Sequence, residues 1–373
     1  MRQARWAGNE PVRTAERHYM ANNRRRRFER RRAALCVLSA LLLTLIAPLA
    51  GPVPAQAAPL DPAALIAQVE PGLVQITTLV DFQGVVGNGT GIVLSPDGQV
   101  LTNHHVVQGA NAIKVLSMAN GQTFEADVIG YDRDDDIAVL QLRGAGGLPV
   151  APIGDSNSLA LGEPVLTIGN ANGTGNPLTH ETGAVTNLNR SIAAEDELTG
   201  SKNSMGGLIE SSTNLRAGDS GGALVNGAGQ VVGLNAAATI NFKVNGESTP
   251  GGEGFAIPIN RAMDIANQIR GGAPSPAVHI GPSAMLGVGI SATGQSGSGL
   301  PVRSVLRGGP ADVVGLRPGD TITTIDGVPI DSANALTGLL DQRYPGNVID
   351  LDWIDRAGIP QNAKVTLAAG PVS

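Results

Sequence analysis

Cysteine, aromatic residues and charge are all scarce in this chain of 373 residues, and each shortage narrows the choice of protein class. The chain has one cysteine, Cys36, so it cannot form an internal disulfide scaffold. Aromatic residues make up 3% of the chain, so any core has to be built from aliphatic side chains. Charged residues make up 16%, which is too few for a disordered or coiled-coil protein.

Glycine and proline, in contrast, are abundant, with 50 and 24 copies. They separate short apolar runs rich in β-branched residues, a pattern that is typical of short strands joined by tight turns. The runs are Val74–Thr78, Gly91–Leu94, Ile113–Leu116, Ala138–Leu142, Pro164–Ile168, Ala223–Val225 and Val231–Leu234. The sequence therefore predicts a mainly β protein, either a sandwich or a barrel, and excludes an all-helical bundle.

The periodicity changes towards the C-terminal part of the chain. Apolar side chains at helical spacing over residues 259–269 predict one amphipathic helix that ends near Gly271. Residues 271–282 follow, and their glycines and prolines indicate a linker between domains. The remaining 283–373 are again rich in strand patterns, with one helical pattern at Ala333–Leu340. We expect two domains, with the boundary in this linker.

The N-terminal residues 1–57 resemble an export signal. Eleven arginines precede the apolar run Ala33–Ala50, and the small residues Ala55 and Ala57 follow it in a cleavage pattern. The competing interpretation is a retained membrane anchor, because about 18 apolar residues can just span a bilayer. Cys36 lies inside this leader, so the exported chain would lack a thiol and could use neither a cysteine nucleophile nor a cysteine-bound zinc ion.

The charge of the chain beyond the leader excludes one class of partner. After residue 57 the chain has 15 basic and 29 acidic residues, a net charge of −14. Such a surface repels phosphate backbones, so we expect no binding to nucleic acid.

Three short segments carry the residues of a nucleophilic site. Residues Thr102–Val107 place histidines after a strand, Asp134–Leu140 places carboxylates before a strand, and Gly218–Gly222 places a serine in a glycine-rich turn. A serine hydroxyl needs an imidazole to accept its proton, and the imidazole needs a carboxylate to fix its tautomer. The order His, Asp, Ser in a β-rich chain excludes the α/β-hydrolase arrangement.

The glycines of the serine turn have a second role. They permit positive φ angles, which allow the N–H groups of Gly218 and Ser220 to converge on a developing oxyanion. We therefore predict an oxyanion hole formed by Gly218 and Ser220.

The motifs in this order resemble the HtrA/Deg family of trypsin-fold serine proteases. The protease motifs are Gly89–Ile92, Thr102–Val107, Asp136–Val139, Gly218–Gly222 and Gly252–Pro258. The marks of a PDZ domain follow at Leu286–Val288, Gly309–Ala311, Gly315–Leu316 and Gly319–Gly327. The resemblance implies a trypsin-like double β-barrel over 58–270, the linker 271–282 and a PDZ domain over 283–373.

The resemblance also implies roles for single residues. It makes Ser220 the nucleophile, His105 the base and Asp136 the acid that orients the base. His104 is the rival to His105, and we interpret it as a packed or solvated neighbour, because the family's catalytic histidine directly precedes Val-Val. Among the three consecutive aspartates, Asp136 directly precedes the strand.

Two positions depart from or refine the family pattern. Asp219 precedes the serine where most members have asparagine, and it can bond to nearby backbone. The residue at the floor of a trypsin-like specificity pocket is the uncharged Asn214. We therefore expect cleavage after small aliphatic residues such as Val, Ala or Leu. The predicted pocket residues are Asn214, Leu215, Ala236, Ala237 and Ala238.

The PDZ resemblance predicts peptide binding by the second domain. PDZ domains add a peptide to an open sheet edge and capture its terminal carboxylate with backbone N–H groups. The predicted carboxylate loop consists of Met285, Leu286, Gly287 and Val288.

Together these features predict an exported serine endopeptidase of the cell envelope or the exterior. It would cleave unfolded or damaged polypeptides, bind apolar C-termini through the PDZ domain, and need no cofactor or metal. The alternative is a catalytically silent, chaperone-like peptide-binding protein. The family implies a homotrimer, and membrane association would require an uncleaved leader.

Overall fold

The computed structural model describes residues 61–80, 85–173, 177–195, 202–236, 243–244, 247–248, 252–290 and 299–372. The predicted leader, 1–57, lies outside the described residues. Within the described ranges, no helix combines the length and the apolar character needed to cross a bilayer.

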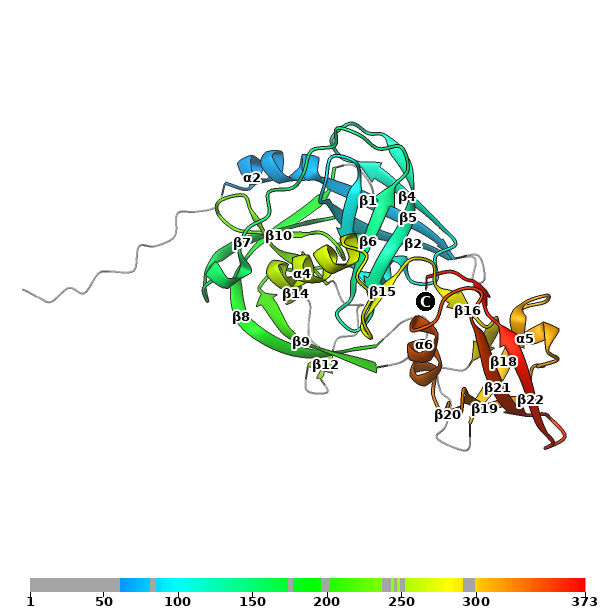
Figure 1. The fold of residues 1–373 in the computed structure, drawn as a ribbon. Helices are drawn as coiled ribbons and strands as arrows, with labels where there is room; N and C mark the ends of the chain where they lie inside the picture. The colour runs from blue at the N-terminus through cyan, green and yellow to red at the C-terminus, as the bar shows by residue number, and fades with distance from the viewer. Residues whose placement is uncertain are drawn as a thin grey trace, which may run out of the picture. The chain divides into compact units, whose positions relative to one another are not determined.

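The first part of the described chain is a closed β-barrel (Figure 1). Its antiparallel strands follow the ring order β5-β4-β1-β2-β3-β6, and pairing between β5 and β6 closes the ring. Aliphatic side chains such as Val74, Ile76 and Val100 fill it, as the scarcity of aromatic residues requires. The strands are β1 (Leu73–Val80), β2 (Val85–Val93), β3 (Gln99–Thr102), β4 (Ala112–Ser117), β5 (Thr123–Asp132) and β6 (Ile137–Leu142).

A second barrel follows with the same closure. Its ring order is β8-β7-β10-β11-β14-β9, closed by β8 and β9, while β12 (Lys243–Val244) and β13 (Glu247–Ser248) extend the sheet from β8. The ring strands are β7 (Pro164–Gly169), β8 (Thr179–Glu195), β9 (Lys202–Ser211), β10 (Ala223–Val225), β11 (Val231–Asn235) and β14 (Gly254–Pro258). The double barrel expected from the family resemblance is confirmed.

Two helices of at least eight residues pack on the barrels. Helix α2 (Pro62–Val69) starts with proline at its first position, and Asp61 caps it by accepting a bond from the Ala64 N–H at 3.2 Å. Helix α4 (Ile259–Arg270) confirms the predicted amphipathic helix. Its apolar face contacts strands of both barrels, so one helix covers the two cores; the buried residues are Ile259, Ala262, Ile265, Ala266 and Ile269.

The C-terminal unit has a main sheet, a separate two-stranded sheet, two helices and its own core, which includes Trp353. The sheet order is β17-β18-β19-β21-β22, with β20 on β19, so β17 is an edge strand. The predicted helix at Ala333–Leu340 is confirmed as α6 (Ala333–Asp341). The remaining elements are β16 (Ala284–Met285), β17 (Val288–Ile290), β18 (Leu300–Val305), α5 (Pro310–Val313), β19 (Thr321–Ile325), β20 (Val328–Pro329), β21 (Val348–Ile354), β22 (Pro360–Thr366) and β23 (Ala368–Ala369).

The segment 271–282, predicted as a linker, contains a short strand, β15 (Val278–Ile280). This strand pairs antiparallel with the end of β5, where Val278 lies opposite Asp132 and Ile280 opposite Gly130. The side chain of Val278 is buried in the barrel core. Turn-forming residues lie on both sides of β15 within this segment, and the alternating apolar residues between them add a strand to the first barrel.

Candidate active site

His105 lies on a short helix directly after strand β3. Helix α3 (His104–Val107) begins after Asn103, and the His105 side chain is 43% exposed. Its Nδ1 lies 2.8 Å from Asp136 Oδ2, and its backbone N–H donates to Asp136 Oδ1 at 2.9 Å. One carboxylate thus holds both the ring and the backbone of His105. This arrangement places the ring proton on Nδ1 and leaves Nε2 as the proton acceptor.

Asp136 lies in the turn between β5 and β6 and has an unusual backbone conformation. Its φ is 54°, in the left-handed region that costs a residue with a Cβ roughly 1–2 kcal/mol. The Asp136 N–H donates to the Arg133 carbonyl at 3.2 Å, and Asn103 Nδ2 donates to the Asp136 carbonyl at 3.0 Å. The backbone of the acid is therefore held from both sides.

The neighbouring candidates make other contacts. Asp135 forms an ion pair with Arg261 of α4, and its N–H donates to Asp132 Oδ1 at 3.0 Å. His104 is 2% exposed, and its ring centroid lies 4.8 Å from that of Tyr131. Asp136 and His105 are thus the carboxylate and the imidazole that contact each other.

The serine turn is tied to the strands that lead to His105. The Thr90 N–H donates to the Ser220 carbonyl at 2.8 Å, and Thr90 Oγ1 donates to the Gly218 carbonyl at 2.8 Å. Thr102 Oγ1 in turn donates to the Thr90 carbonyl at 2.7 Å. Because Thr102 ends strand β3 just before helix α3, these bonds join the turn of the second barrel to the strands of the first that deliver His105.

Two glycines of this turn cannot carry side chains. Gly218 has φ 97° and Gly221 has φ 80°, both in the region that favours glycine. A Cβ at Gly218 would overlap the Asn170 carbonyl oxygen, and one at Gly221 would overlap the Thr90 carbonyl oxygen. The backbone that would form an oxyanion hole therefore packs directly against neighbouring backbone.

The Asp219 carboxylate accepts hydrogen bonds from two neighbouring residues. It accepts from the Arg216 N–H at 2.9 Å and from Thr179 Oγ1 at 3.0 Å. Burial raises the pKa of Asp219, and these hydrogen bonds oppose the shift. Asp219 thus stabilises the turn before Ser220 by accepting a hydrogen bond from nearby backbone, as the sequence predicts.

The predicted specificity pocket is described in part. Ala236 is buried, Asn214 and Leu215 are partly buried, and Ala237 and Ala238 lie outside the described residues. A Cβ at Gly254 of β14 would overlap Thr213 Oγ1 and come within 3.1 Å of Leu215 Cγ, so glycine at this position leaves room for Leu215. Across the residues that the structure describes, no group of three or more candidate ligand side chains could hold a metal ion.

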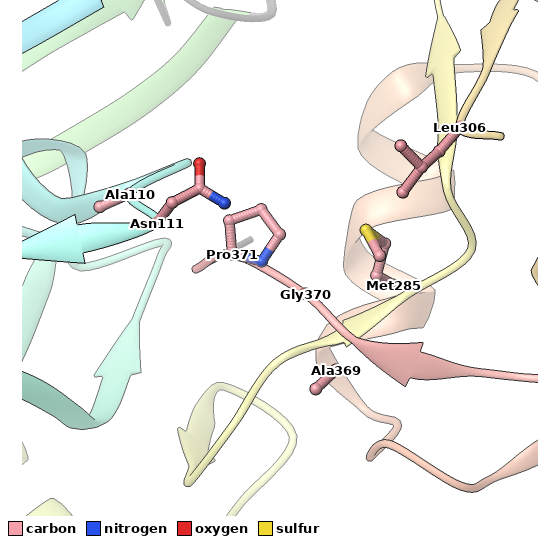
Figure 2. A pocket seen from close by; sticks show the side chains of 7 residues that line it. All are labelled: Ala110, Asn111, Met285, Leu306, Ala369, Gly370 and Pro371. Atoms are coloured by element: carbon pink, nitrogen blue, oxygen red, sulfur yellow. The ribbon is translucent and has the colours of Figure 1, made fainter. Parts of the chain in front are cut away.

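The predicted carboxylate loop of the PDZ domain forms backbone hydrogen bonds with the segments that follow it in the chain. The Leu306 N–H donates to the Gly287 carbonyl at 2.9 Å, and the Ala311 N–H donates to the Leu286 carbonyl at 3.0 Å. Gly287 has φ 80°, and the loop leads into the edge strand β17. A cavity of about 600 Å³ adjoins it (Figure 2), lined by Ala110, Asn111, Met285, Leu306, Ala369, Gly370 and Pro371.

Sequence reasoning gave no role to three buried polar residues of the site: Thr90, Thr102 and Asn103. All three lie inside motifs that mark the family resemblance. Their contacts are with backbone carbonyls distant in sequence, which no local pattern reveals.

A pH prediction comes from Asp132, at the end of β5. Burial raises the pKa of this carboxyl from 3.8 to about 6, and the charge of Asp134 adds to the shift. The folded state therefore binds the proton more tightly than the unfolded chain, so ionisation between pH 4 and 6 lowers stability. We expect Asp132→Asn, which does not titrate, to gain about 1–2 kcal/mol of unfolding free energy relative to wild type over this window, after solvent screening is allowed for.

Urea unfolding at pH 4, 5, 6 and 7 measures this difference. The exposed Asp331→Asn is the matched control and should show no such trend. A stability difference between Asp132→Asn and wild type that stays constant from pH 4 to 7 would contradict the prediction.

Known proteins resemble both parts of the chain. Residues 89–234 match the family model of the trypsin-like peptidase domain, and residues 302–349 match that of the PDZ domain. Serine protease PepD of Mycobacterium tuberculosis is 33% identical over 340 residues, which cover 86% of this chain and 70% of PepD. The putative serine protease HhoA of Synechocystis is 33% identical over 283 residues, which cover 72% of this chain and 68% of HhoA. Serine endoprotease DegS of Escherichia coli is 33% identical over 269 residues, which cover 70% of this chain and 71% of DegS. The chain therefore belongs to the HtrA/Deg family and is a serine endopeptidase with a trypsin-like peptidase domain and a PDZ domain.

Proposed function

We propose that Ser220, His105 and Asp136 form the catalytic triad of this endopeptidase. The observation that carries the proposal is the carboxylate of Asp136, which holds both the Nδ1 and the N–H of His105. Ser220 lies in the turn that Thr90 joins to the same barrel. The chain thus supplies a base of fixed tautomer and a hydroxyl in a rigid turn.

These groups perform acyl transfer in two steps. His105 Nε2 accepts the hydroxyl proton as Ser220 Oγ attacks the peptide carbonyl carbon, and Asp136 stabilises the imidazolium that forms. The N–H groups of Gly218 and Ser220 stabilise the oxyanion of the tetrahedral intermediate. His105 then gives its proton to the leaving amine, which breaks the peptide bond and leaves an acyl-enzyme. Water, activated by the same imidazole, attacks the acyl-enzyme and regenerates the serine.

The substrates we propose are unfolded or damaged polypeptides with apolar C-termini. An extended chain can enter the site between the barrels and can also add to the open edge of β17. The loop around Gly287 would receive the terminal carboxylate through its backbone N–H groups. The uncharged Asn214 and Leu215 favour cleavage after Val, Ala or Leu.

We propose that the protein works outside the cytoplasm, in the cell envelope or secreted, as a homotrimer. The location is supported by the leader pattern of residues 1–57 and by relatives such as the probable periplasmic serine endoprotease DegP-like of Halomonas elongata, which is 33% identical over 294 residues. The homotrimer is what the family resemblance implies. If the leader were not cleaved, it would attach this protein to the membrane.

Covalent labelling by a fluorophosphonate tests the nucleophile. The folded wild-type protein should be labelled, whereas Ser220→Ala should lose both the label and about 10⁴-fold or more in turnover, because the substitution removes the proposed nucleophilic hydroxyl. Mass spectrometry of the labelled peptide identifies the residue. A folded wild type that takes no label would identify the protein as a silent peptide-binding relative instead.

Specificity should follow the charge at the pocket floor. We expect Asn214→Asp to gain cleavage after Lys and Arg, because a carboxylate would pair with a cationic side chain. The ratio of cleavage after Lys or Arg to cleavage after Ala should rise by at least tenfold. A peptide library profiled by mass spectrometry measures the shift. The exposed turn variant Asn120→Asp should keep the aliphatic profile. A wild-type profile dominated by Lys or Arg would refute the neutral pocket.

Peptide binding by the PDZ domain should depend on Gly287. We expect Gly287→Ala to weaken binding of a peptide with an apolar, free C-terminus by about 3- to 10-fold, because φ 80° strains a residue with a Cβ. Fluorescence anisotropy measures this. Gly358→Ala, at φ 82° in a remote hairpin with open space around its Cβ, is the matched control. Equal affinities for free and amidated peptides would contradict carboxylate capture.

A further inference from the structure

The turn that carries Asp136 is anchored on both flanks by side chains from other elements. On one flank, Asp135 pairs with Arg261 of α4. On the other, Arg133 forms an ion pair with Asp341, the last residue of helix α6 in the PDZ domain. Arg133 also supplies the carbonyl that accepts the Asp136 N–H. A strained residue persists only where its surroundings fix it, so these anchors bear directly on Asp136.

The Asp341 carboxylate holds a second residue of the same strand end. Tyr131 is 1% exposed, and its hydroxyl donates to Asp341 Oδ1 at 2.9 Å, while Arg133 contacts Oδ2. The Tyr131 hydroxyl also lies 3.2 Å from Ser283 Oγ. Each oxygen of one carboxylate thus fixes one of the two residues that flank Asp132.

The ring of Tyr131 connects this anchor to the histidine helix. It lies between the rings of His104, at a centroid distance of 4.8 Å, and His279, at 5.1 Å. His279 continues the stack to Tyr344 at 4.9 Å, and its Nδ1 lies 2.7 Å from the Asp341 carbonyl oxygen. His104, Tyr131 and His279 are each at most 3% exposed. A series of ring contacts therefore connects His104, the residue before His105, with His279, whose Nδ1 contacts the last residue of helix α6.

The position of Asp341 is unfavourable for the helix itself. Helix α6 ends at Asp341, where the partial negative charge of the helix terminus repels a carboxylate. Its contacts with Arg133 and Tyr131 offset this repulsion, because both are donors supplied by the protease domain. The carboxylate therefore acts on the turn of Asp136 rather than on its own helix.

We propose that Asp341 and Tyr131 are positioning residues of the protease reaction. Asp341, from the PDZ domain, fixes the turn of Asp136 through Arg133, and it fixes Tyr131, which packs against His104. This inference rests on the proposed triad. Displacement of a catalytic group by about 1 Å can cost about 100-fold in rate, so a partly loosened turn should lower turnover measurably.

The test uses the full-length protein with Asp341→Asn or Tyr131→Phe. The substrate is an internally quenched peptide with an amidated C-terminus, so that capture of a free carboxylate does not enter the rate. We expect kcat to fall about tenfold and KM to stay within about twofold, because binding is kept while alignment is lost. The rate of fluorophosphonate labelling at saturation should fall in parallel. The double variant should cost no more than the larger single one.

A matched control lies in the same domain. Asp350→Asn removes an exposed ion pair with Lys364 and should leave kcat unchanged. Tyr131→Phe keeps the ring stack and the core volume, so it carries the test if Asp341→Asn does not fold by circular dichroism.

Three outcomes distinguish the positioning role from a purely structural role and from failure of the triad proposal. A tenfold loss of kcat in both single variants, measured below their melting temperatures, supports the positioning role. Unchanged kcat with a lowered melting temperature overturns it and leaves Asp341 with a purely structural role. Absence of label on wild type would refute the triad proposal itself.

Discussion

The contact between Asp136 and His105 depends on a backbone conformation that few residues adopt. The carboxylate reaches both Nδ1 and N–H of His105 from a residue at φ 54°, in the left-handed region that residues other than glycine adopt only occasionally. Asn103 and Arg133 hold this conformation through the carbonyl and the N–H of Asp136. Neighbouring hydrogen bonds thus stabilise the backbone that positions the His105 ring, and this position depends on buried polar contacts rather than on the apolar core.

The serine turn shows how two barrels can share one site. Thr90 of β2 bonds to both Gly218 and Ser220, and Thr102 of β3 bonds to Thr90. Threonine suits these positions because a β-branched residue fits a strand while its hydroxyl satisfies a distant carbonyl. Ser220 from one barrel and His105 from the other are therefore joined by a short path of buried hydrogen bonds, which resists relative movement of the two turns.

The sequence predicted the elements whose residue pattern is local. Apolar strands, helices α4 and α6 and the serine turn follow from periodicity and turn residues. The long strands β8 and β9 escaped prediction because their polar, glycine-containing sequences lack an apolar run, and pairing with each other defines them. The glycines and prolines on both sides of strand β15 indicate a linker, whereas its pairing with β5 is a contact distant in sequence. The contacts of Tyr131 with Asp341 join residues 210 positions apart, and no spacing rule connects them.

Strand β15 has a consequence for how such a protein can be divided. The chain that enters the PDZ domain first completes the edge of the protease barrel, beside the strand that ends at Asp132. A fragment cut at the glycines near residue 271 would expose the backbone edge of β5 and empty the place of Val278 in the core. Because β15 pairs with the protease barrel, gene rearrangements that exchange the second module would have to preserve this short strand.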